Sequence, residues 1–155
     1  MAFITNRTQG DVARRQELAH KGIANMTSEE MAEWLTPSKG AYNYIDLNRV
    51  EEAVAKIISY MAAIDREGAF HPTRVWNESD VPTKAEMDRY IANVKAIRDA
   101  FPELHHVMPV APATMANLTY AGANAIEEIL SVAMQYVESR IQAFPFSGEI
   151  YGGEI

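Results

Sequence analysis

Hydrophobic residues recur at spacings of three and four along most of the chain, the period of an amphipathic helix. The clearest stripe predicts a helix over residues 44–65. A second is expected over 84–101, after the capping box Thr83-Lys84-Ala85-Glu86, and a third over 119–144, with Pro145 ending it. The apolar positions of these stripes are Leu47, Val50, Val54, Ile57, Ile58, Met61 and Ile64; Met87, Tyr90, Ile91, Val94, Ile97 and Phe101; and Ile126, Ile129, Leu130, Ala133, Val137, Ile141 and Phe144.

Two shorter helices are predicted before these. One covers about residues 9–21 and is closed by Gly22, and the other is opened by the capping box Thr27-Ser28-Glu29-Glu30. We expect the second to bury Met31, Trp34 and Leu35. No run alternates with period two, so the sequence predicts an all-α fold: a compact bundle of about five helices, three long and two short, within a single domain of residues 1–145.

The last ten residues, 146–155, are predicted to form an extended arm. Their glycines oppose a stable helix, yet Phe146, Ile150 and Tyr151 make the segment too apolar for a purely solvated tail. A disordered end is one interpretation. The other is an arm that packs on a neighbouring subunit.

Composition narrows the class of protein. The chain has 155 residues, 48% of them hydrophobic, no cysteine, and a net charge of −7. These values predict one globular domain without disulfides, and they disfavour non-specific binding to nucleic acid or to an anionic membrane. The start shows no signal-peptide pattern, so we expect synthesis in the cytoplasm without export. Residues 102–155 carry few charges, which is typical of deep burial within one subunit or between subunits.

An internal echo links two of the predicted helix starts. In each copy a tyrosine is followed four residues later by an asparagine and then by a Glu-Glu pair: Tyr44, Asn48 and Glu51-Glu52; Tyr120, Asn124 and Glu127-Glu128. Asn43 and Thr119 precede them as helix caps. The asparagines are expected to tie incoming loops by hydrogen bonds, and the glutamates to complement helix dipoles in first turns. Duplication and convergence both remain open.

No reactive constellation emerges from the sequence. The four histidines lack partners at metal-ligand spacing, and no nucleophile or phosphate-binding motif is present. We therefore expect no enzyme, no cofactor and no metal. Aromatic residues could line a ligand pocket, although packing in a core or an interface is their commoner fate; these are Trp34, Tyr42, Tyr44 and Trp76.

Several segments together are similar to a known group of proteins. They are Asn6-Arg7-Thr8-Gln9-Gly10-Asp11-Val12, Ala32-Glu33-Trp34-Leu35, the most specific stretch Gly40-Ala41-Tyr42-Asn43-Tyr44-Ile45-Asp46-Leu47-Asn48-Arg49-Val50, Asp80-Val81-Pro82-Thr83, Asn93-Val94-Lys95-Ala96-Ile97-Arg98, and Leu118-Thr119-Tyr120-Ala121-Gly122-Ala123-Asn124-Ala125-Ile126-Glu127. In this order they resemble small helical proteins of phages and prophages of Gram-positive gut bacteria, found among tail and baseplate genes.

The resemblance implies a virion setting. The expected function is that of a non-enzymatic structural or adaptor protein of the tail or baseplate, with other tail proteins and copies of itself as partners, and with neither nucleic acid nor membrane among them. The alternative is a free helical regulator or a module that binds a peptide or small ligand between its helices.

Overall fold

The computed structural model describes the backbone of residues 1–152 and the side chains of residues 1–143, and within this part of the chain every regular element is helical. The predicted all-α class with five helices is confirmed. The helices are α1 (Gln9–Lys21), α2 (Ser28–Leu35), α3 (Tyr44–Ala63), α4 (Lys84–Ala100) and α5 (Tyr120–Gly152), with short 3₁₀ turns at Ile23–Asn25 and Pro102–Leu104.

Local capping explains where most helices begin. A capping box opens each of α1 to α4, in which the cap side chain accepts a hydrogen bond from the backbone and a carboxylate three residues later accepts one from the cap backbone. The boxes at Thr27 and Thr83 are those the sequence predicts. Gly22 closes α1 with φ 77°, a conformation that favours glycine.

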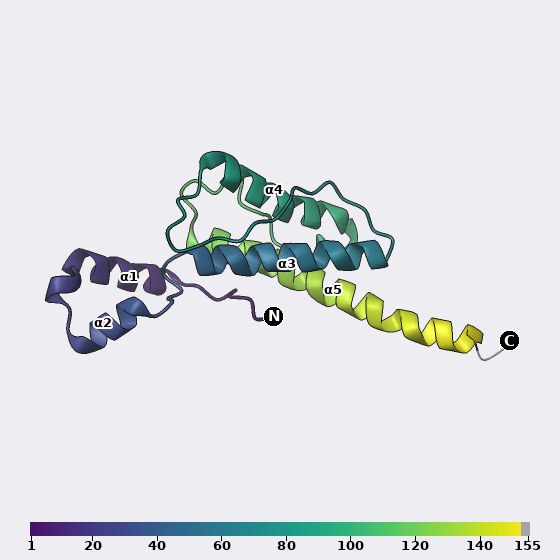
Figure 1. Ribbon diagram of the computed structural model, residues 1–155, viewed down its shortest axis with the longest axis horizontal. Helices are drawn as coiled ribbons and strands as arrows, with labels where there is room; N and C mark the ends of the chain where they lie inside the picture. Colours follow the sequence, from purple (N-terminus) through teal and green to yellow (C-terminus); the bar gives the residue numbers. More distant parts are fainter. Residues whose placement is uncertain (153–155) are drawn as a thin grey trace.

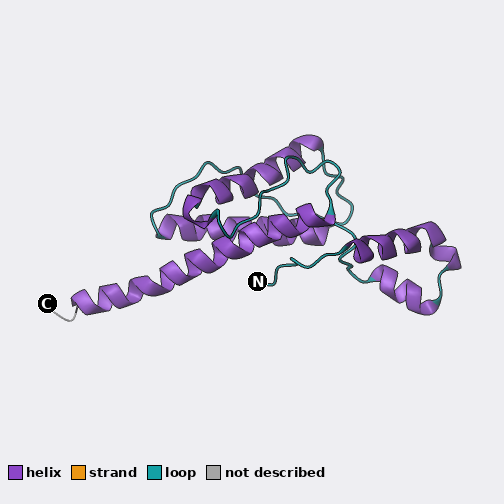
Figure 2. Ribbon diagram, turned by 180° about the vertical axis from the view of Figure 1, so that it is seen from behind, coloured by secondary structure: helices purple, strands orange, loops and turns teal. Residues whose placement is uncertain are grey.

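The helices α3, α4 and α5 form the core and run in the same direction (Figures 1 and 2). Ion pairs join Arg49 to Glu127 near the starts of α3 and α5, and Lys56 to Glu138 further along both helices. The apolar stripes of all three helices meet in one cluster, which Trp76 and Met108 from the connecting segments complete. Most positions of the predicted stripes therefore lie in this core or pack against it, whereas Ile141 does neither and the side chain of Phe144 lies outside the described residues.

Parallel helices require long connections, and here each connection runs back along the length of the bundle. Residues 64–83 return from the end of α3 to the start of α4, and residues 101–119 return from α4 to α5 (Figure 1). Neither segment contains a strand within its described residues, so side chains must supply partners for its backbone groups.

The α1–α2 hairpin stands beside the three-helix core instead of joining it (Figures 1 and 2). Leu18 is its single buried residue among α1 and α2. The prediction that α2 buries Leu35 is wrong, because that side chain is 75% exposed, and Met31 and Trp34 are only half-buried. Two short helices offer too little apolar surface to enclose all three side chains.

The end of α5 also differs from the prediction. The helix continues through Pro145 to Gly152, so Pro145 does not stop it and residues 146–152 are helical instead of extended. Proline has a helical φ, but it lacks the N–H of one ladder hydrogen bond and its ring crowds the carbonyl four residues earlier, so a helix that continues through it bears a cost. The second half of α5 projects past the end of α3 (Figure 1). Residues 153–155 lie outside the described part of the chain.

Candidate functional site

Three asparagines, one on each core helix, clamp the backbone of a segment that lies outside any helix. Asn48 and Asn93 hold the returning segment 64–83, and Asn124 holds the residues before α1. In each clamp the side-chain oxygen accepts from a residue's N–H and the side-chain amide donates to the same residue's carbonyl. The distances are 2.7 and 2.8 Å for Asn48 on Trp76, 2.8 and 3.0 Å for Asn93 on His71, and 2.9 and 2.9 Å for Asn124 on Arg7. The clamps thus satisfy the backbone groups that the absence of strands in these segments leaves open.

The α3 clamp includes a glutamate one turn further along the helix. Glu51, only 3% exposed, accepts a hydrogen bond from the indole N–H of Trp76 at 3.3 Å. Its second partner is the guanidinium of Arg89 on α4. Helix α3 therefore holds Trp76 by both its backbone and its side chain, and Arg89 joins α4 to the same glutamate.

The α5 clamp repeats this arrangement with an arginine in place of the tryptophan. Arg7, which is 4% exposed, donates to Glu127 at 2.7 Å and to Asp46 at 2.9 Å. Arg49 of α3 also binds both carboxylates, with two hydrogen bonds of 2.6 and 2.8 Å to Glu127. The backbone N–H of Ile4 adds a further hydrogen bond to Glu127 at 2.7 Å. Two guanidinium groups thus neutralise two carboxylates in the interior.

The charges of this cluster are fixed by its hydrogen bonds. Burial alone would raise the pKa of Glu127, but hydrogen bonds from Arg49, Ile4 and Arg7 outweigh it, so the pKa of this carboxyl lies below its ordinary value. The same hydrogen bonds raise the pKa of Arg49. Glu127 and Arg49 are therefore both charged at neutral pH.

A pair of tyrosines borders the cluster. The hydroxyl groups of Tyr42 and Tyr90 lie 2.6 Å apart, and the guanidinium of Arg7 lies 5.4 Å from the centre of the Tyr42 ring. Burial raises the pKa of both phenols, which keeps them protonated. This pair joins the linker before α3 to the middle of α4.

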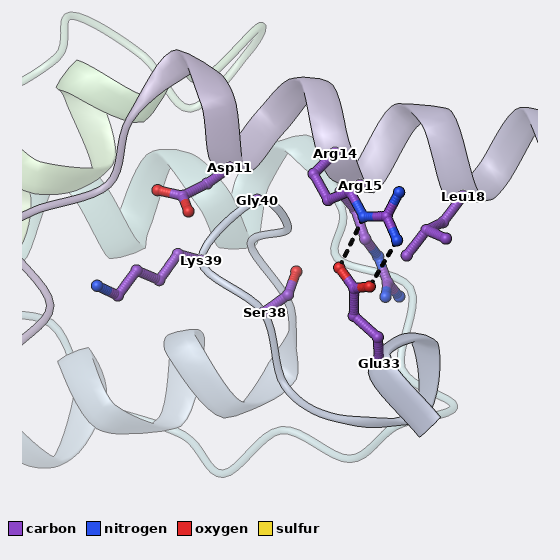
Figure 3. Close-up of a pocket in the computed structure, with 8 residues that line it drawn as sticks. All are labelled: Asp11, Arg14, Arg15, Leu18, Glu33, Ser38, Lys39 and Gly40. Atoms are coloured by element: carbon purple, nitrogen blue, oxygen red, sulfur yellow. Dashed lines mark hydrogen bonds and ion pairs between the residues drawn. The ribbon is translucent and has the colours of Figure 1, made fainter. Parts of the chain in front are cut away.

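A small cavity of about 80 Å³ lies where α1, α2 and the linker 36–43 meet (Figure 3). Arg14 donates two hydrogen bonds to Glu33 across it, at 2.9 and 2.7 Å. Arg15 stacks on the ring of Trp34 at 3.6 Å and donates to the Trp34 carbonyl. At this cavity Arg14 thus pairs with Glu33, and Arg15 contacts Trp34. These contacts hold α1 and α2 together where apolar burial is scarce.

The predicted site residues fall into three groups. Asn43, Asn48 and Asn124 make the hydrogen bonds expected of them, while Tyr42, Tyr44 and Trp76 pack against the core. Trp34 lies in the hairpin, and Tyr120 is 37% exposed at the start of α5. The side chains of Phe146, Ile150 and Tyr151 lie outside the described residues.

Sequence reasoning missed the groups that complete the clamps. Glu51 and Glu127 were expected in first turns, which is wrong, because each is the eighth residue of its helix and is buried in ion pairs. The spacing Asn-x-x-Glu, shared by both helices, could have indicated this role. Asn93 carried a different signal, since it is a polar residue within the apolar stripe of α4. The unpredicted partners are Arg7, Asp46, Arg49 and Arg89.

Two further observations concern metal ions and membranes. Among the side chains that the structure describes, no three histidines, cysteines or carboxylates converge to hold a metal ion. No helix in the described part of the chain is long and apolar enough to span a membrane. The clamps hold extended backbone of the chain's own segments. No protein-family model, curated protein or solved structure matches this chain.

Proposed function

We propose that the protein is a non-enzymatic structural or adaptor component of a phage tail or baseplate, which works by assembling with copies of itself and with other tail proteins. One observation in particular supports this proposal. Three buried charged groups, Arg7, Asp46 and Glu127, hold the chain's own segments together. Groups that are joined in buried ion pairs supply rigidity and recognition, which an assembly component needs.

The shape of the molecule supports the same role. The α1–α2 hairpin projects at one end of the core and the second half of α5 projects at the other (Figures 1 and 2). The hairpin buries a single residue of its two helices within its own subunit, so it is available for contacts with neighbours. The virion setting itself comes from the sequence resemblance.

Particle composition tests the proposal. Phage particles are purified from an induced host culture by density gradient, and the chain is quantified against a major tail protein by mass spectrometry with isotope-labelled peptides. We expect a fixed, stoichiometric copy number that survives a high-salt wash. A cytoplasmic protein of the same culture serves as the contamination control. Absence of the chain from washed particles would contradict the proposal.

The alternative function, a free module that binds a peptide, has its own supporting observation. Asn124, Glu127 and Asp46 hold an extended segment by its backbone and by an arginine, as a peptide receptor would. Recovery of the chain only from the particle-free fraction would favour this alternative.

A further inference from the structure

The first eight residues of the chain are held as a bound peptide would be. Asn124 clamps the backbone of Arg7, and the Arg7 side chain enters the pair of carboxylates from α3 and α5. Upstream, the Ile4 N–H binds Glu127, and Phe3 packs against the core. We call residues 1–8 the N-terminal strap, and the surface of α3 and α5 that holds it the strap groove.

The strap groove cannot stand empty without an electrostatic cost. Asp46 and Glu127 are buried, and without Arg7 they would share Arg49 as their single cation among the ion pairs of the described residues. An unbalanced buried carboxylate is strongly destabilising. Whatever fills the groove must therefore be an extended segment with an arginine in the position of Arg7.

The strap and the hairpin behave as one unit with respect to the core. Within the described residues, no hydrogen bond or ion pair joins residues 9–35 to α3, α4 or α5. The hydrogen bonds and ion pairs of the hairpin side chains are made within the hairpin or with the residues that cap its helices. The strap and the linker 36–43 alone connect this unit to the core by such contacts. Residues 39–42 of the linker border a second cavity, of about 100 Å³, which also adjoins Arg7 of the strap and the start of α5.

We propose that this N-terminal unit is exchanged between copies of the chain, so that the strap of one copy occupies the strap groove of a second copy. The second copy is the fitting occupant because its strap has the required sequence and remakes every contact that the first copy gives up. The strap groove binds its own strap in dilute solution and the strap of a neighbour where copies are concentrated. The inference rests on the proposed function, since an assembly concentrates copies of this chain.

Cross-linking between two labelled chains tests the exchange. The sequence contains no cysteine, so introduced cysteines are unique. One chain carries Thr5→Cys in the strap, and a second, ¹⁵N-labelled chain carries Glu128→Cys, an exposed position beside Glu127 on α5. Both full-length chains are mixed over a range of concentrations, treated with a flexible bis-maleimide, and analysed by intact-mass spectrometry.

We expect a mixed-isotope dimer whose yield rises with concentration and exceeds at least fivefold that of a control acceptor, Ser139→Cys, which lies further along α5. A synthetic peptide of residues 1–10 should reduce this yield when added in excess, whereas the same peptide with Arg7→Ala should not. This comparison requires no destabilised protein, because the competing change is in the peptide alone.

The exchange is wrong if cross-links form within a doubly substituted Thr5→Cys, Glu128→Cys chain while the mixed dimer stays at the level of the Ser139→Cys control at every concentration. In that case stoichiometric copies in purified particles would still leave the tail role standing. Conversely, a mixed dimer combined with absence from particles would support the exchange and contradict the tail role.

Discussion

Replacing Asn48 by alanine tests whether the asparagine clamps stabilise the fold. The change removes both hydrogen bonds to Trp76, of 2.7 and 2.8 Å, and leaves an N–H and a carbonyl without partners at a residue that is only 2% exposed. An unsatisfied buried polar group costs about 1–3 kcal/mol, so two groups that water reaches only in part should cost about 2–4 kcal/mol of unfolding free energy. The helical content of the folded state should not change.

Urea unfolding followed by circular dichroism and tryptophan fluorescence measures this loss. Asn77→Ala is the matched control, because this exposed asparagine of the same returning segment makes no side-chain hydrogen bond in the described structure and should change stability by less than about 0.5 kcal/mol. Asn48→Asp keeps the acceptor for the Trp76 N–H and should lie between the two. An Asn48→Ala protein as stable as the control would refute the clamp as a stabilising element.

Further changes address the buried charges, the linker and the end of the chain. Glu127→Gln leaves the guanidinium groups of Arg7 and Arg49 with Asp46 as their shared carboxylate partner, and it should cost about 3–5 kcal/mol in urea unfolding. Because the folded pKa of Glu127 is depressed, its contribution to wild-type stability should be full above about pH 5 and fall as the pH drops through the folded pKa, with a shallower fall in the variant. Gly40→Ala would place a Cβ 2.0 Å from a backbone oxygen of α1 and should cost about 1–3 kcal/mol, seen as faster amide exchange in α1, while Gly10→Ala, with no atom nearer than 3.5 Å, should not. Deleting residues 146–155 should leave the helical core folded but lower the mass of the assembly in light scattering, and an unchanged mass would contradict a role for this end in assembly. Prolonged chelation should leave the melting temperature unchanged.

The helices could be predicted because the signals that define them are local. The capping box at Thr83 and the glycine after α1 act within a few residues of the helix end, so the printed sequence contains them in full. Periodicity likewise identifies the core, because a residue three or four positions away shares the same face. The end of α5 could not be predicted in this way, because a proline inside a helix has a cost that other interactions can offset.

The strap groove could not be predicted for a different reason. Arg7 and Glu127 are separated by 120 positions, and nothing local indicates that they meet. Their contact depends on the parallel course of the core helices, which the stripes do not specify. An arginine among polar neighbours such as Asn6 and Thr8 is typical of a solvated segment, and only the topology turns it into a buried ion pair.

The three clamps help to decide between duplication and convergence for the echo between α3 and α5. Asn93 performs the same task on α4, yet neither a tyrosine four residues earlier nor a glutamate three residues later accompanies it. A clamp is therefore what any of these helices needs when an unpaired segment runs back along it, because the segment's buried N–H and carbonyl groups require partners. The shared glutamate has a similar cause, since Trp76 and Arg7 both bring a donor into the interior one turn beyond the clamp. The topology thus accounts for the asparagine and the first glutamate of the echo, and for these two positions convergence is the simpler explanation.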